Sequence, residues 1–148
     1  MIVFDEQDFI DSLISVVKKA FAGTEWRAYF GGKNMKIVDD NFGETTSFPV
    51  MYIGISDCTE AVGTYTNSKD EQYTDVEFEI ECYNQEVGKK TKREVGLAIN
   101  KHLVTTLKEY MNPHIQTNTQ ISSQDESIYR RRITGYVIYD NKNKIFYR

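Results

Sequence analysis

Three glutamates alternate with apolar residues in the stretch Tyr73–Tyr83, and their carboxylates are the first groups in this chain that could do chemistry. On a strand, Glu77, Glu79 and Glu81 would share one face and lie about 6–7 Å apart along it. Such a row suits three uses: a solvent-facing surface, cross-strand ion pairs, or an acid–base or metal site. The third use needs a His or a further Asp at ligand spacing, or the lysine of a nuclease-type Glu-x-Lys pattern, and neither stands beside the row. We therefore expect no metal site there and leave the first two uses open.

Two arginines offer partners for these carboxylates. Arg130 and Arg132 alternate in the same way within the stretch Ser127–Tyr139, which also has the period of two that is typical of a strand. Opposite charges that face each other on neighbouring strands attract. We therefore predict that both stretches belong to one sheet, and that Arg130 and Arg132 form sheet ion pairs or part of an interface. If such pairs are exposed, each should contribute only about 0–1 kcal/mol.

Other reactive side chains do not form a recognisable site. The Gly-Gly-Lys sequence at 31–33 lacks the remaining glycine and the Ser/Thr of a phosphate-binding loop. His102 falls in the apolar stripe of a predicted helix, where we expect a hydrogen-bonded histidine, and His114 is expected in a loop. Cys58 and Cys82 lack metal-type spacing, and Cys82 is expected to be a buried thiol. With no nucleophile elbow, Cys–His pair or dinucleotide fingerprint, the sequence predicts no enzyme and no catalytic, cofactor-binding or metal-ligating residues.

Four cations crowd the start of a predicted helix: Lys89, Lys90, Lys92 and Arg93. Positive charge at a helix N-terminus opposes the helix dipole, so local helix stability does not explain the cluster. Two interpretations remain open, a solvated charged run and a contact for an acidic partner.

Two helices should position these residues. The apolar side chains of Asp5–Phe21 recur at helical spacing, with Asp5 as the N-cap. The helix Thr91–Met111 begins with a capping box formed by Thr91 and Glu94 and ends before Pro113. Strands are predicted at Trp26–Phe30, Met35–Val38, Val50–Ile55, Tyr73–Tyr83, Thr117–Ser122, Ser127–Tyr139 and Lys144–Tyr147.

Because the strands come in pairs and do not alternate with helices, the predicted fold class is α+β. We expect a single domain spanning residues 1–148, a mostly antiparallel β-sheet, and the two helices packed on one face of it. The polar stretches Asp39–Ser47 and Ser56–Gln72 are expected to be loops, the second long and mobile in the free protein and ordered on a partner.

The composition points to a cytoplasmic globular protein of 148 residues with an aromatic-rich surface. The net charge is −4, so bulk attraction to nucleic acid is not expected. The ten tyrosines suit half-buried or interface positions on strands. The first residues, MIVFDEQDF, are too short and acidic for a signal peptide, and no apolar run reaches the roughly 20 residues of a membrane span.

The order of elements resembles that of the tail-terminator, or tail-completion, proteins of long-tailed bacteriophages. A first helix is followed by an apolar strand after a proline (Phe48-Pro49-Val50), a long loop and the alternating strand Val76–Tyr83. The helix Thr91–Met111 and a long arginine-bearing strand closed by a hairpin (Tyr129–Arg148) complete the pattern. The resemblance covers most of the chain, but residues 25–42 have no match in it.

The resemblance implies a homohexameric ring that caps the tail tube, stops its polymerisation and joins the tail to the head. Its partners would be the tail tube protein and the head-proximal neck or connector protein, and DNA would cross the ring without specific binding. The protein would occupy the host cytoplasm during assembly and then the head–tail junction of the virion. Glu77, Glu79 and Glu81 facing the channel would repel phosphates. A head–tail connector or head-stopper ring, and a small cytoplasmic enzyme with an unrecognised site, are the alternatives.

Overall fold

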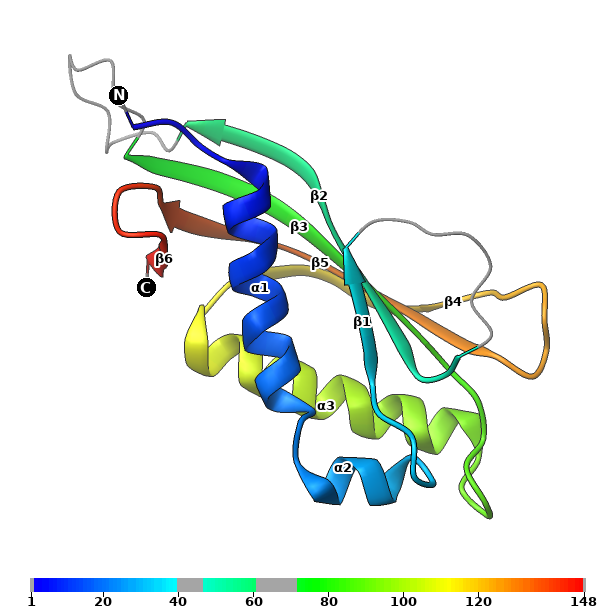
Figure 1. The fold of residues 1–148 in the computed structure, drawn as a ribbon. Helices are drawn as coiled ribbons and strands as arrows, with labels where there is room; N and C mark the ends of the chain where they lie inside the picture. Colours follow the sequence, from blue (N-terminus) through cyan, green and yellow to red (C-terminus); the bar gives the residue numbers. More distant parts are fainter. Residues whose placement is uncertain (1, 40–46, 61–71, 148) are drawn as a thin grey trace.

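A computed structural model describes residues 2–39, 47–60 and 72–147, with the side chains of 57–60 left undescribed (Figure 1). These residues form three helices and six strands, and all six strands belong to one mixed, curled sheet. The predicted α+β fold class, with a mostly antiparallel sheet, is confirmed.

The sheet is built around two long central strands that run antiparallel. β3 (Tyr73–Asn84) pairs with β5 (Tyr129–Asp140) along twelve positions, and β2 (Val50–Glu60) flanks β3. The strand order is β1-β2-β3-β5-β4, with β6 also on β5, and only the pair of β1 with β2 is parallel. The outer strands are β1 (Lys36–Asp39), β4 (His114–Ile121) and β6 (Ile145–Tyr147).

Helices α1 (Glu6–Ala20) and α3 (Lys92–Tyr110) both lie on one face of the sheet, with the short helix α2 (Thr24–Tyr29) beside them (Figure 1). Their caps follow the sequence. The Asp5 carboxylate accepts hydrogen bonds from the N–H groups of the first turn of α1, and Thr91 Oγ1 accepts one from the Glu94 N–H at 3.2 Å. Among the described residues, no helix is both long enough and apolar enough to cross a membrane.

The core lies between this face of the sheet and the two long helices. The alternation of β3 is realised as predicted, because every second residue from Val76 to Cys82 is buried. The fully buried side chains facing them from the helices include Phe9, Leu13, Val17, Ile99, Leu103 and Leu107.

The predicted strand Trp26–Phe30 is wrong, because this segment contains helix α2. Trp26, Tyr29 and Phe30 stand at i, i+3 and i+4, so a helix gathers them on one side, where the Trp26 ring packs against Phe21 and His102 at centroid distances of 5.0 and 4.9 Å. A five-residue run cannot separate a period of two from a period of 3.6.

Two further boundaries differ from the prediction. β2 continues to Glu60, five residues into the predicted loop Ser56–Gln72, because its backbone keeps pairing with β3. His114 begins β4 and is not in a loop. Residues 61–71 of the predicted long loop, and residues 40–46 of the predicted loop Asp39–Ser47, lie outside the described part of the chain.

Candidate functional site: the open face of the sheet

All described helices lie on one side of the sheet, and the opposite side, here called the open face, carries the predicted glutamates and arginines (Figure 1). Residues paired directly across strands share a face, so the register orders the open face into rows. One row runs Tyr52, Glu81, Arg132, Thr119 across β2, β3, β5 and β4. The neighbouring rows place Tyr83 beside Arg130, Glu79 beside Thr134, and Glu77 beside Tyr136.

Glu81 is the centre of an ion-pair network on this face. Its carboxylate accepts hydrogen bonds from Arg130 Nη2 at 2.8 Å, Arg132 Nη2 at 2.6 Å and the Tyr83 hydroxyl at 2.7 Å. Arg132 Nε also lies 2.9 Å from Glu79 Oε1. The predicted sheet ion pairs of Arg130 and Arg132 are therefore present.

Burial differs sharply between the two paired glutamates. The Glu81 side chain is 13% exposed and that of Glu79 is 34% exposed. Burial opposes ionisation of Glu81, but the hydrogen bonds from Arg130, Tyr83 and Arg132 outweigh it and lower the pKa of this carboxyl. For Tyr83, burial and the hydrogen bond to Glu81 raise the pKa to about 12, so its hydroxyl stays protonated at neutral pH.

Glu77 does not join the network. In the part of the chain that the structure describes, its carboxylate forms no ion pair. The register explains this, because Glu77 stands opposite Tyr136, two rows beyond Arg132 on this face. The predicted row of three equivalent carboxylates therefore consists of two neutralised ones and one free of ion pairs.

Tyrosines complete the open face. The rings of Tyr52 and Tyr83 meet edge to face at a centroid distance of 5.4 Å, and the Arg130 guanidinium lies 5.4 Å from the centre of the Tyr83 ring. Sequence reasoning missed Tyr83 and Tyr52 as members of the site. The period of two that aligned the glutamates extends to Tyr83, but Tyr52 could not be placed without knowing the register between β2 and β3.

The four predicted partner-contact cations lie away from the open face, around the start of α3, and two of them have internal partners. Lys90 Nζ donates to the Tyr29 carbonyl at 2.7 Å and lies 3.6 Å from the centre of the Tyr29 ring. Lys92 Nζ donates to the carbonyl of Glu126. Lys89 and Arg93 are exposed and form no ion pair with another described residue.

Among the described residues, each of the two borders of the sheet has one strand edge without a pairing strand. β4 and β6 follow one another along the same side of β5, opposite 130–136 and 138–140. β1 forms the other border beside β2. No described strand pairs with the outer side of either border.

The side chains of the open face offer hydroxyl, guanidinium and carboxylate groups that can form hydrogen bonds and ion pairs. Within residues 2–39, 47–60 and 72–147, no group of three or more His, Cys, Asp or Glu side chains is placed to hold a metal ion. His102 Nε2 lies 2.8 Å from the Ala20 carbonyl oxygen, which confirms the expected hydrogen-bonded histidine.

No family model and no curated protein matches this sequence.

Proposed function

We propose that this protein is a structural subunit that assembles head to tail into a ring, caps the tail tube of a long-tailed bacteriophage and joins it to the head. The observation that carries the proposal is the one-sided sheet, with α1 and α3 on one face and a tyrosine-, arginine- and glutamate-bearing open face on the other. The order of elements that resembles the tail terminators supports the same assignment.

Subunit contacts would form at the borders of the sheet. A border strand with unpaired backbone groups readily pairs with another chain. If the β4–β6 border of one subunit meets the β1 border of the next, the contact is heterologous, and such contacts close into a ring when the rotation per subunit suits the subunit number. Six subunits are taken from the resemblance. Each contact would need to bury at least about 1,000 Å² to be specific.

The open face would then line the channel, with the helices outside. Arg130 and Arg132 are held by carboxylates at 2.6–2.9 Å, so neither is available to bind DNA phosphates. The predicted repulsion of phosphates falls mainly to Glu77, because Glu79 and Glu81 are neutralised by the arginines. A face whose arginines are paired and that keeps a surplus of carboxylates would let DNA pass without specific binding.

A matched pair of substitutions tests the ring. Ile145 on β6 and Leu97 on α3 are large apolar side chains, 56% and 42% exposed, but only Ile145 lies at a border of the sheet. Light scattering during size exclusion and negative-stain microscopy would be applied to the free proteins and to proteins mixed with purified tails. We expect rings for the unchanged protein and for Leu97→Lys, and none for Ile145→Lys, because lysine at a border strand opposes pairing.

The proposal fails if the unchanged protein forms no ring in solution and never occupies the head-proximal end of tails. It also fails if Ile145→Lys, shown to be folded by circular dichroism, forms rings as readily as Leu97→Lys. A two-fold dimer that uses the open face as its interface would contradict the assignment of that face to the channel.

A further inference from the structure

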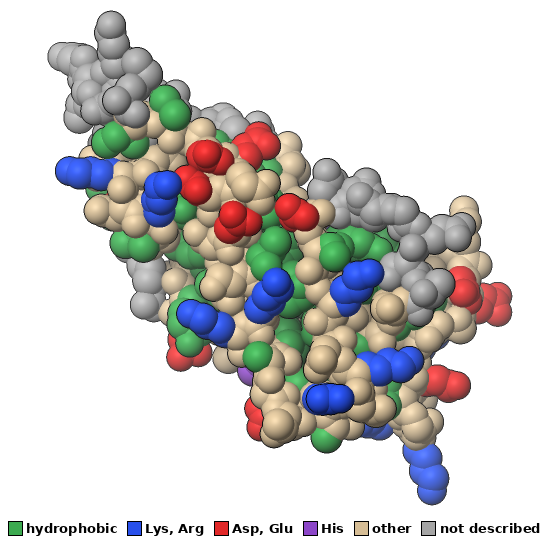
Figure 2. Space-filling view, viewed as in Figure 1, with side chains coloured by type: hydrophobic (Ala, Val, Ile, Leu, Met, Phe, Trp, Pro, Cys, Tyr) green, Lys and Arg blue, Asp and Glu red, His purple; other side chains and the backbone are tan. Residues whose placement is uncertain are grey.

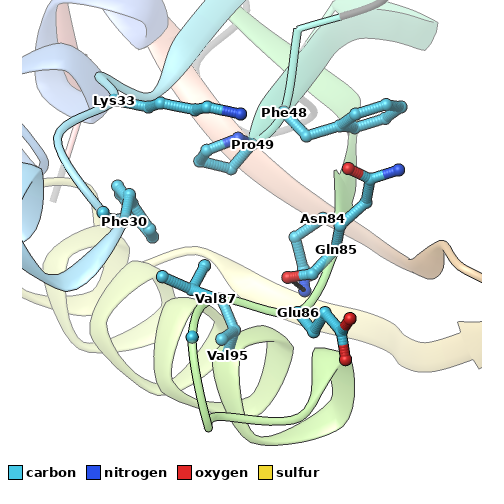
Figure 3. A pocket seen from close by; sticks show the side chains of 11 residues that line it. Phe30, Lys33, Phe48, Pro49, Asn84, Gln85, Glu86, Val87 and Val95 are labelled. Carbon is cyan, nitrogen blue, oxygen red and sulfur yellow. Dashed lines mark hydrogen bonds between the residues drawn. The ribbon is translucent and has the colours of Figure 1, made fainter.

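A cavity of about 240 Å³ lies where three segments distant in sequence meet (Figure 3). Its walls come from the connection between α2 and β1, the residues that lead into β2, and the loop between β3 and α3. Five of the eleven lining residues have large apolar side chains: Phe30, Phe48, Pro49, Val87 and Val95; Asn84 and Gln85 add amide groups. The charged side chains of the lining are Lys33 and Glu86.

The walls are held together before any ligand arrives. Lys90 bonds the β3–α3 loop to helix α2 through the Tyr29 carbonyl, and Val87 and Lys90 exchange two backbone hydrogen bonds at 2.9 and 3.1 Å. Gly31, with φ of 70°, passes close to Val87, since a Cβ at that position would lie 3.3 Å from Val87 Cγ1. A preformed cavity loses little conformational entropy on binding.

The size of the cavity suits one side chain. Pockets for drug-sized molecules usually measure about 300–1,000 Å³, which is more than this cavity offers. In the lining, Phe30, Val95 and Asn84 are 2%, 0% and 1% exposed, so the buried end of the cavity has two apolar side chains and one amide. Large side chains that fill such pockets are typical anchors of protein–protein contacts.

The surroundings of the cavity are rich in cations. Lys33 extends over Pro49 along the cavity (Figure 3). Lys89 follows the lining residue Gly88 in the chain. Lys33 and Lys89 are exposed and form no ion pair with another described residue. Figure 2 shows Lys and Arg side chains over the half of the molecule that holds α2 and α3, with some Asp and Glu side chains at its edges, and a cluster of Asp and Glu side chains over the start of α1.

We propose that this cavity docks an acidic segment of another protein, which inserts one aromatic or large aliphatic side chain while its carboxylates lie against Lys33 and Lys89. The inference goes beyond the ring and does not depend on it, because no lining residue belongs to the border strands β1, β4 or β6. A nucleic acid fits less well, because Phe48, Pro49 and Val87 in the lining suit an apolar side chain, whereas nucleic acids are held mainly by several cations on consecutive phosphates.

The probe is a blocked heptapeptide with one phenylalanine between two runs of three glutamates, titrated into the ¹⁵N-labelled protein at low salt. We expect saturable amide shifts at Gly31, Val87 and Gly88. Replacing the phenylalanine of the peptide by alanine, or its glutamates by glutamines, should each weaken binding by about tenfold or more. Raised salt should weaken binding of the parent peptide as well.

Two charge reversals give a matched control within the protein. Lys33→Glu should weaken binding of the parent peptide by about tenfold, whereas Lys101→Glu, at an exposed position of α3 outside the cavity lining, should change it by less than about twofold. Equal effects of the two reversals would show that the peptide follows net charge alone and would overturn the proposal.

Three other results would also overturn it. The first is the absence of saturable shifts at the cavity, or shifts of equal size with the alanine peptide. The second is a shift of the same amides with protein concentration alone, which would make a second copy of this chain the occupant. The third is displacement of the peptide by single-stranded oligothymidylate at comparable concentration, which would indicate a nucleic-acid surface.

Discussion

Replacing Glu81 by glutamine should destabilise the fold by about 2 kcal/mol at neutral pH, whereas Glu79→Gln should cost less than about 0.5 kcal/mol. The two positions are neighbours on one face of β3 and the chemical change is identical. They differ in burial, with side chains 13% and 34% exposed, and in the number of hydrogen-bond donors that face them.

The magnitude follows from the contacts of Glu81. Hydrogen bonds to charged groups contribute about 1.5–3 kcal/mol and neutral ones about 1 kcal/mol, so loss of the charge removes about 1 kcal/mol at each arginine. Arg130 and Arg132 are the two donors concerned, and the bond from the Tyr83 hydroxyl can persist to the glutamine oxygen. Among the described residues, Glu79 forms its ion pair with Arg132. The side chains of Arg132 and Glu79 are 38% and 34% exposed, so solvent screens the attraction between them.

The pH dependence has a definite sign. The pKa of Glu81 is lowered in the folded protein, so its contribution is complete above the ordinary value of 4.5 and is lost as the pH falls through the lowered pKa. Urea unfolding followed by fluorescence of Trp26, the single tryptophan, measures the free energy of unfolding. The difference between the unchanged protein and Glu81→Gln should be largest at neutral pH and should shrink in acid. Equal losses for the two variants, or a difference independent of pH, would refute this account.

Three further predictions use other contacts. Gly96→Ala should cost about 2 kcal/mol in urea unfolding, because its Cβ would lie 2.3 Å from the Tyr129 ring, and a stabilised variant would contradict this. The Cys82 thiol, fully buried with its pKa raised to about 12, should react with a disulfide reagent only after unfolding, and native-state labelling mapped to its peptide would disprove it. Lys90→Met should cost about 1 kcal/mol and speed amide exchange in α2, whereas Lys89→Met should do neither.

The sequence predicts best where one physical signal dominates. In β3 the alternation of apolar and acidic residues predicts both the strand and its two faces. When Val76, Phe78, Ile80 and Cys82 are buried on one face, the glutamates between them must lie on the other. The same holds for β5, where Tyr129, Ile133 and Val137 are buried on the helix face. The caps Asp5 and Thr91 could be placed because their side chains act on their own first turns.

The sequence fails where the outcome depends on contacts between distant segments. Nothing local distinguishes Glu77 from Glu81, yet the register of β3 against β5 gives one a tyrosine neighbour and the other two arginines. The docking cavity is formed by three segments that are far apart in the sequence, and no shared sequence motif indicates that they meet. In the sequence, Lys33 stands out only as part of an incomplete phosphate-binding loop, and its place in the cavity lining depends on how α2 packs against the β3–α3 loop.

The distribution of charge links the ring to the docking cavity. On the open face, Arg130 and Arg132 are paired with Glu79 and Glu81, Asp75 and Glu77 add further carboxylates, and the remaining groups are largely tyrosine and threonine. A face whose arginines are already paired and whose surplus charge is negative has little affinity for a polyanion, which is what a channel wall for DNA requires. Around the cavity, Lys33 and Lys89 form no ion pair with another described residue. We infer that the two surfaces have different roles. The open face would let DNA pass, and the cavity with its neighbouring lysines would bind an acidic segment of another protein. An assembly built this way should lose its neighbour when Lys33 is reversed in charge, while its rings stay intact.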